Sequence, residues 1–182
     1  GGHNAEMHNQ NDVGSFTVDL CGEALVCELG RPRFRRGTFG AERYEILANS
    51  SLGHSVPIPN GGAQLPGAER AATLLEHHHD ARADVLGLDL SDAYPAEANI
   101  ASLQRLLTLH REPPRGWVEL VDRVRFRAPG TFATQLITLA RVEVGAGVVR
   151  IAGERGRLRV EYAPRSVEVS VVEDRGVELD AG

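Results

Sequence analysis

Short apolar segments with period-two alternation recur along the chain, and they constrain its fold more than any other feature. The segments are rich in Val, Leu, Ile and Phe and lie at 15–20, 24–28, 84–90, 118–127, 148–152, 157–162 and 166–172. Alternation gives each strand one face to bury. Turn signals such as Asn60-Gly61-Gly62 and Pro113-Pro114 separate the segments. The sequence therefore predicts an all-β fold, an antiparallel β-sandwich of two large, twisted sheets with little helix.

Length and composition limit the class of protein further. The 182 residues fit a single domain over 1–182, and 42% hydrophobic residues can form a core without disulfides. No apolar run approaches the ~20 residues of a membrane helix, so we expect no membrane span. All 20 basic residues are arginine, and against 25 acidic residues they give a net charge of -5. This balance argues against nucleic acid as a partner.

The two cysteines flank an expected hairpin turn. A two-residue turn at Gly22-Glu23 would pair Cys21 with Ala24 and Cys27 with Val18. In that register the two thiols do not face each other, so we expect no disulfide between them.

Two further segments are less regular. The stretch 95–111 fits an amphipathic helix by composition, but its second half leads into the Pro113-Pro114 turn and an alternating partner at 118–127. We therefore favour a hairpin for that half. The stretch 31–62 has few alternating runs and is expected to form long loops, where functional sites usually lie.

The stretch 2–16 holds a dense set of polar side chains just before the first strand. It reads GHNAEMHNQNDVGSF, with two histidines and several amides. Such residues are poor core material, because burying them costs desolvation free energy. They indicate either a functional site or a polar loop whose Asn and Asp side chains satisfy turns.

Four sequence motifs along the chain resemble those of a known protein family. They are GGHNAEMHNQNDVGSF at 1–16, ELGR at 28–31, RYEILANSSLGHSVP at 43–57 and LDLSDAYP at 88–95. Together, and in this order, they resemble the C-terminal β-sandwich of heparinase II/III-like polysaccharide lyases, a group that includes oligoalginate lyases. The resemblance implies a supersandwich-like fold and an N-terminal (α/α) toroid, absent from this chain, with the active site in the cleft between the two. It also implies a secreted or periplasmic protein.

The resemblance assigns catalytic and substrate-binding roles to particular residues. His8 holds the place of the histidine that faces the uronic acid, with Asn9 and Asn11 beside it as substrate-binding residues. Tyr44 matches the tyrosine that serves as general acid and base.

The resemblance also implies a metal site. His54 and Glu28 hold the places of two metal ligands, although the family has aspartate where Glu28 stands. Gln10 replaces a ligand histidine, and a neutral amide oxygen is a poor zinc ligand. Zinc, calcium and no metal at all therefore stay open. We expect His8, Gln10, Glu28 and His54 to converge on one surface patch, because a hairpin after Asp12 returns the chain to the loops at 31–62.

The chemistry of β-elimination independently needs such residue types. Removing the weakly acidic proton beside a uronate carboxylate requires a cation or a hydrogen-bond donor near the developing enolate. A tyrosine can then protonate the departing glycosidic oxygen, and a histidine can act as base or donor. We therefore expect an acidic polysaccharide as the substrate. A non-catalytic carbohydrate-binding or structural sandwich is the alternative.

Other polar residues are weaker candidates. Arg31 and Arg33 belong to a basic cluster next to Glu28, which either grips substrate carboxylates or is a solvated loop. His77 and His79 would share one strand face, as an adventitious metal site or, with better odds, as a solvated strand end. Trp117 is either a sugar-stacking platform or, more commonly for a residue beside a turn, a packing residue.

Overall fold

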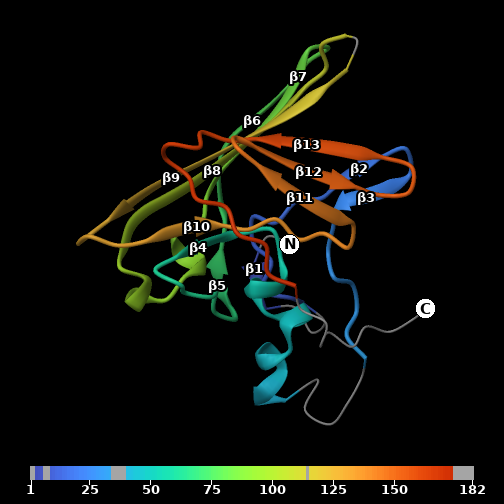
Figure 1. Cartoon of the computed structure of the whole chain (residues 1–182). Coiled ribbons are helices and arrows are strands. Elements are labelled where there is room, and N and C mark those ends of the chain that lie inside the picture. Colours follow the sequence, from blue (N-terminus) through green and yellow to red (C-terminus); the bar gives the residue numbers. More distant parts are fainter. Residues whose placement is uncertain (1–2, 6–8, 34–39, 114, 174–182) are drawn as a thin grey trace.

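A four-stranded antiparallel sheet, β6-β7-β8-β9, is the largest element of the fold (Figure 1). The computed structural model describes residues 3–5, 9–33, 40–113 and 115–173. The sheet contains β6 (Thr73–His79), β7 (Ala83–Asp89), β8 (Ile100–His110) and β9 (Trp117–Phe126). The β6–β7 tip projects away from the rest of the protein (Figure 1). The hairpin expected for the second half of 95–111 is thus confirmed, because β8 pairs with β9 over its length.

Smaller antiparallel sheets complete the architecture. β11 (Arg141–Gly145), β12 (Val148–Ala152) and β13 (Arg157–Glu161) form a three-stranded sheet. Two-stranded pairs join β1 (His3–Asn4) to β5 (Gly67–Ala71), β2 (Val18–Leu20) to β3 (Glu23–Val26), and β4 (Pro57–Pro59) to β10 (Phe132–Thr134).

Helical structure in the described chain is limited to single 3-10 turns. These are η1 (Ala41–Glu45), η2 (Leu47–Asn49), η3 (Ser51–Gly53), η4 (Ser91–Ala93) and η5 (Ala96–Ala98). The expectation of an all-β, sandwich-like antiparallel fold with little helix is confirmed. No helix among the described residues is long and apolar enough to cross a membrane.

The last alternating segment, 166–172, does not form a strand. It lies without secondary structure, and its valines are largely in solvent, with Val172 87% exposed. The prediction was wrong because alternation produces a strand only where a neighbouring edge can accept its hydrogen bonds, and this segment pairs with no described strand.

The first hairpin turns one residue earlier than predicted. Leu20 pairs with Glu23, so the turn residues are Cys21 and Gly22, with φ of 56° and 72°. Two positive φ angles define a type I′ turn, whose twist matches that of the flanking strands. The register then shifts between Val18 and Asp19, so the predicted pairings were wrong. The two cysteines are nevertheless free and form no disulfide with each other, as expected. Cys21 is exposed and Cys27 is buried.

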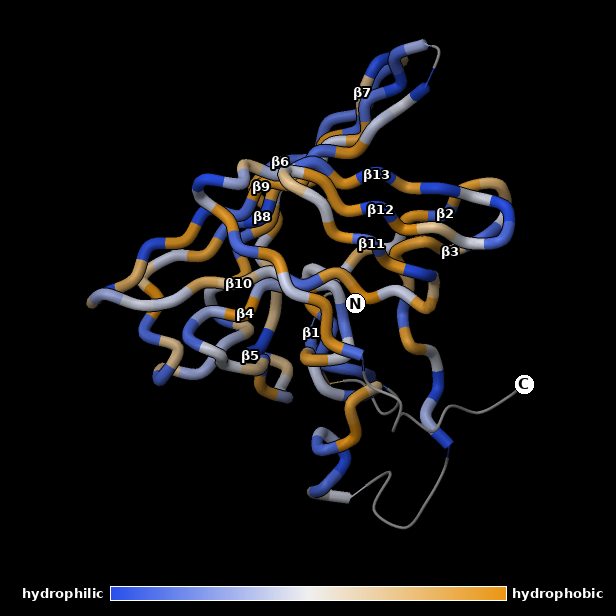
Figure 2. The backbone as a smooth tube through the Cα atoms, viewed as in Figure 1, coloured by the Kyte–Doolittle hydropathy of each residue, from blue (hydrophilic) through white to orange (hydrophobic). Residues whose placement is uncertain are grey.

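Two apolar clusters form the core. The first packs Val13, Leu90, Tyr94 and Leu103 together, behind the inner face of β8. The second packs Leu25 and Val26 of β3 against Ile151 of the three-stranded sheet. Figure 2 shows the alternation that produces these clusters, with hydrophobic and hydrophilic residues following one another along the strands.

A buried arginine joins the inner side of the large sheet to three other segments. Arg105 of β8 is 1% exposed and forms a two-bond ion pair with Asp122 of β9, with both N···O distances 2.8 Å. Its Nη1 also donates to the carbonyl oxygens of Gly14 and Ser55, at 2.8 and 2.7 Å, and its Nη2 donates to the Thr134 hydroxyl. A buried charge is tolerated when its hydrogen bonds are satisfied in this way.

Glu23 fastens the first hairpin to the β12–β13 turn, and this predicts a pH-dependent stability. Its carboxylate accepts the backbone N–H groups of Arg155, Gly156 and Glu154 at 2.8–2.9 Å, and these bonds lower its pKa from the ordinary 4.5. A lowered pKa in the folded state adds stability above pH 4.5, which is lost as the pH falls through the folded-state pKa. We expect Glu23→Gln to be less stable than the parent at pH 7.

Urea denaturation across pH 2–7 measures this difference. The gap between Glu23→Gln and the parent should close as the pH falls below about 4.5. Glu154→Gln, in the same turn, is the matched control and should change the free energy of unfolding little. A gap that stays constant down to pH 2 would show that the carboxylate charge of Glu23 contributes nothing.

Candidate functional site

A tight turn between residues 12 and 15 directs the chain from the polar N-terminal segment toward β2. The Ser15 N–H donates to the Asp12 carbonyl oxygen, and Gly14 has φ of 82°. A Cβ at Gly14 would lie 2.7 Å from the side chain of Leu90, so both the backbone angle and the packing require glycine. The turn leaves the Ser15 hydroxyl beside Glu28, which follows β3.

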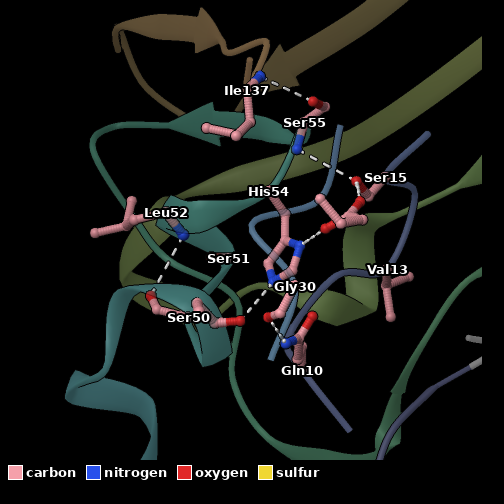
Figure 3. Close-up of polar contacts among 12 residues, drawn as sticks. Gln10, Val13, Ser15, Gly30, Ser50, Ser51, Leu52, His54, Ser55 and Ile137 are labelled. Carbon is pink, nitrogen blue, oxygen red and sulfur yellow. Dashed lines mark hydrogen bonds and ion pairs between the residues drawn. The ribbon is translucent and has the colours of Figure 1, made fainter. Parts of the chain in front are cut away.

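The segment 47–54 presents His54 from two consecutive 3-10 turns, η2 and η3. A Cβ at Gly53 would lie 2.2 Å from the Leu47 carbonyl oxygen, so glycine is needed for the two turns to pack. The Ser50 hydroxyl accepts the Leu52 N–H at the start of η3. His54 follows, is fully buried, and has its Nε2 3.2 Å from the Ala48 carbonyl oxygen (Figure 3).

Ser15, Glu28 and His54 form a connected polar cluster, and Figure 3 shows Ser15 and His54 side by side within it. The Ser15 hydroxyl donates to Glu28 Oε1 at 2.5 Å and accepts the Ser55 N–H at 3.2 Å, while His54 Nδ1 contacts Glu28 Oε2. The Glu28 side chain is 31% exposed, whereas His54 is closed off from solvent. Burial raises the pKa of the Glu28 carboxyl group, but the bonds from His54 and Ser15 outweigh this effect and hold it below its ordinary value.

The partners of His54 define what its Nδ1 can do. Because the Ala48 carbonyl oxygen only accepts, Nε2 carries a proton. Nδ1, the other ring nitrogen, faces the Glu28 carboxylate. In metal-binding histidines, the ring nitrogen that does not bind the metal commonly donates a hydrogen bond to a carbonyl or carboxylate oxygen, which orients the ring.

The polar segment after His8 is held between η1 and the loop that follows β3. The Tyr44 hydroxyl, on half-buried η1, donates to Asn9 Oδ1 at 3.2 Å, and Arg43 donates to the Asn9 backbone oxygen. Gln10 Nε2 donates to the Gly30 carbonyl oxygen at 3.1 Å, two residues after Glu28. The structure therefore brings Asn9, Gln10, Glu28, Tyr44 and His54 into one region from three separate stretches of chain. His8 lies outside the described residues.

The expected surface patch is only partly at the surface. Glu28 and His54 are in contact, but His54 has no exposed area, so an external ligand can reach it only past Glu28. Asn11 is also buried, at 1% exposure, and donates from Nδ2 to the Gln64 carbonyl oxygen. The contacts of Asn11 in the structure join segments of the protein to each other. Its role in substrate binding stays a prediction. Arg31 and Arg33 lie exposed on the loop after Gly30.

Gln64 is a structural centre that the sequence did not reveal. Its side chain exchanges two hydrogen bonds with the backbone of Val13 and also contacts Asn4 and the Tyr94 hydroxyl. Its backbone N–H donates to the Ser51 hydroxyl at 2.8 Å. A single glutamine in a loop carries no sequence signal for this role. Gln64 explains why the polar segment before β2 can be buried.

Among the described residues, no group of three or more His, Cys, Asp or Glu side chains could hold a metal ion. Catalytic zinc sites take three protein ligands, whereas Glu28 and His54, which are in contact, provide two.

The remaining candidates lie apart from this cluster. His77 and His79 are on β6, whose residues are all exposed. His79 Nδ1 lies 3.3 Å from Asp84 Oδ1, as a solvated strand end would allow. Trp117 is 48% exposed and stacks on His110, with ring centroids 3.7 Å apart, so one face of the indole is already covered.

No protein-family model matches the sequence, and no curated protein is significantly similar to it.

Proposed function

We propose that this chain is the β-rich part of a lyase that cleaves uronic-acid-containing polysaccharides by β-elimination. One observation carries the proposal, namely that the segment 9–10 lies against both Tyr44 and the loop of Glu28, which itself contacts His54. These are the residues to which the family resemblance assigns catalysis and metal binding. A phenol, a carboxylate–imidazole pair and amide groups within one region match the residue types that β-elimination needs.

Tyr44 is the residue best suited to proton transfer. Asn9 Oδ1 accepts its hydroxyl proton, and Asn9 Nδ2 is itself held by the Gln10 carbonyl oxygen at 3.3 Å. The amide therefore has a defined orientation and fixes the phenol through it. In the proposed reaction His8 takes the C5 proton of the uronate as the base. The C4–C5 double bond then forms as the C4–O bond breaks, and Tyr44 delivers its phenolic proton to the departing glycosidic oxygen. Arg31 and Arg33 bind neighbouring substrate carboxylates.

A divalent ion, zinc or calcium, would be held by Glu28 Oε2, His54 Nδ1 and the Gln10 amide oxygen. Bound there, it would supply positive charge next to the substrate carboxylate. Ser15 and the Ala48 carbonyl then act as the groups that orient the carboxylate and the imidazole.

The proposal includes partners and a location. We propose that the second wall of the substrate cleft is an N-terminal toroid domain of the same protein. We also propose that the enzyme is secreted or periplasmic, because its substrate is an extracellular polymer. The sandwich alone provides only part of the donors and little of the substrate positioning, so we expect the isolated chain to be inactive.

A spectroscopic assay on the whole protein tests the reaction. β-Elimination creates a carbon–carbon double bond conjugated to the carboxylate, which absorbs in the ultraviolet. We expect this absorbance to rise with alginate, heparan sulfate or another uronate polymer, and not with neutral dextran. Cleavage of dextran, or cleavage of uronates without the absorbance, would contradict the proposal.

A non-catalytic carbohydrate-binding module is the second candidate. It is favoured by the full burial of His54, which lets the Ser15–Glu28–His54 cluster serve only to join the first hairpin to the segment 47–55. Under this alternative the whole protein binds uronate polymers and releases no product.

A further inference from the structure

The three-stranded sheet β11-β12-β13 has a solvent face that carries an arginine-rich pattern. Its other face packs Val142, Ile151 and Leu158 against the core. Because side chains alternate, the residues between them point outward. The outward residues include Arg141, Glu143, Arg150, Ala152, Arg157, Arg159 and Glu161, which we call the arginine face.

Two of these arginines are neutralised by their own strands. Arg141 lies 3.2 Å from Glu143, and Arg159 lies 2.9 Å from Glu161. Arg150 and Arg157 are exposed and form no ion pair with any described residue. The face thus has an excess of positive charge in a chain whose net charge is -5.

The register places the two unpaired arginines near each other and beside the ion-paired Arg159. Arg150 stands directly opposite Arg159, and Arg157 is the diagonal neighbour of Arg150, about 7–8 Å away. Like charges directly opposite each other destabilise a sheet. On its other side Arg150 stands opposite Glu143, which already carries the ion pair with Arg141. Neither Arg150 nor Arg157 forms an ion pair with a described residue, so a bound anion would give each of them a partner.

Ala152 gives this face its shape. It lies between Arg141 on β11 and Arg157 on β13, so two strand spacings of about 4.8 Å separate the arginines across a short side chain. Ala152 is the shortest side chain in this row, with a longer arginine side chain on each neighbouring strand. Each guanidinium can hold a carboxylate through two parallel hydrogen bonds.

We propose that the arginine face is a second binding site for a linear uronate polymer, distinct from the region of Tyr44 and Glu28. The identity of the polymer rests on the proposed function above. Glu143 and Glu161 favour sugar over nucleic acid, because their oxygens can accept hydrogen bonds from sugar hydroxyls, whereas they repel closely spaced phosphates. The site holds the polymer while the cleft acts on one linkage.

Calorimetric titration of the chain with polygalacturonate tests this site without any need for turnover. We expect the Arg150→Gln/Arg157→Gln variant to bind about five- to tenfold more weakly than the parent, which corresponds to two exposed ion pairs. Binding should also weaken as salt screens these charges. Arg123→Gln/Arg125→Gln is the matched control, because it removes the same charge from the exposed face of β9, and it should bind like the parent.

The outcomes separate this proposal from the proposed function. Equal weakening in both double variants, unchanged binding in the first, or equally tight binding of single-stranded DNA would overturn the arginine face as a polysaccharide site, whether or not the whole protein is a lyase. If the Arg150→Gln/Arg157→Gln variant binds polygalacturonate more weakly but the whole protein has no lyase activity, the arginine face is supported as a binding site and the proposed function is wrong. Thermal melting offers a fold control, since Arg150 and Arg157 are exposed and their replacement by glutamine should change the midpoint little.

Discussion

Replacing Arg105 with methionine is expected to destabilise the protein by about 3–5 kcal/mol, the typical cost of leaving one partner of a buried ion pair alone. Asp122, whose side chain is 5% exposed, would then be a buried carboxylate without its guanidinium. The carbonyl oxygens of Gly14 and Ser55 would also lose their donor. Urea denaturation measures the change in the free energy of unfolding.

Two further variants keep this prediction testable even where Arg105→Met fails to fold. Arg105→Met/Asp122→Leu removes both charges and should recover much of the lost stability, because apolar pairs often replace buried ion pairs without loss. Arg123→Met, on the exposed face of β9, should change stability by no more than about 0.5 kcal/mol. A loss below about 1 kcal/mol in Arg105→Met would contradict the account of this residue.

Arg105 also links the stability of the sheet to the candidate site. Through one nitrogen, Nη1, it holds the residue before Ser15 and the residue after His54. Ser15 and His54 are the two partners of Glu28. Arg105 is therefore a positioning residue, and its loss should also loosen the Ser15–Glu28–His54 cluster.

Tyr44→Phe is expected to lower the turnover number of the whole protein at least about a hundredfold. Phenylalanine keeps the ring of η1 in place and removes only the hydroxyl that donates to Asn9. Losing one transition-state donor costs about 3 kcal/mol, and the loss should appear in kcat because the proton is transferred during the reaction. Initial rates of ultraviolet-absorbing product measure it. His8→Ala should cause a loss of the same order.

Tyr162→Phe is the matched control for Tyr44→Phe. Its hydroxyl donates to the Gly145 carbonyl oxygen at 2.9 Å, next to the three-stranded sheet. It should leave kcat unchanged. Near-normal turnover in Tyr44→Phe would remove the assignment of Tyr44 as general acid, and the same result in His8→Ala would leave the N-terminal segment a structural role.

The sequence predicted most of the strands because alternation reports directly which face of a strand is buried. It misplaced the first turn because both Cys21-Gly22 and Gly22-Glu23 are compatible with a tight turn, and the choice depends on two positive φ angles. It also predicted a strand at 166–172, where the pattern is present but no described strand offers a partner. Both errors concern strand pairing: which residues face each other across the first hairpin, and whether 166–172 has a partner strand. The alternation within a segment does not encode its pairing.

The candidate site was predictable where residue type carries its own chemistry. Glu28 and His54 were matched by the strings around them, and the fold brings them into contact. Ser15 and Gln64 were missed because their importance comes only from neighbours distant in the chain. Arg105 had a detectable signal, since a charged residue stands at an inward position between Leu103 and Leu107, facing the inward Asp122 of the next strand. A charge on the apolar face of each of two adjacent strands predicts such a pair.

Product masses after digestion in oxygen-18 water test the central claim most directly. β-Elimination breaks the glycosidic bond without adding water, so the new non-reducing end should be an unsaturated uronate, lighter by one water than a hydrolysis product, and neither new end should carry oxygen-18 from the cleavage step. We expect this result for the whole protein acting on a uronate polymer. Saturated products labelled with oxygen-18 would identify a hydrolase and contradict the account.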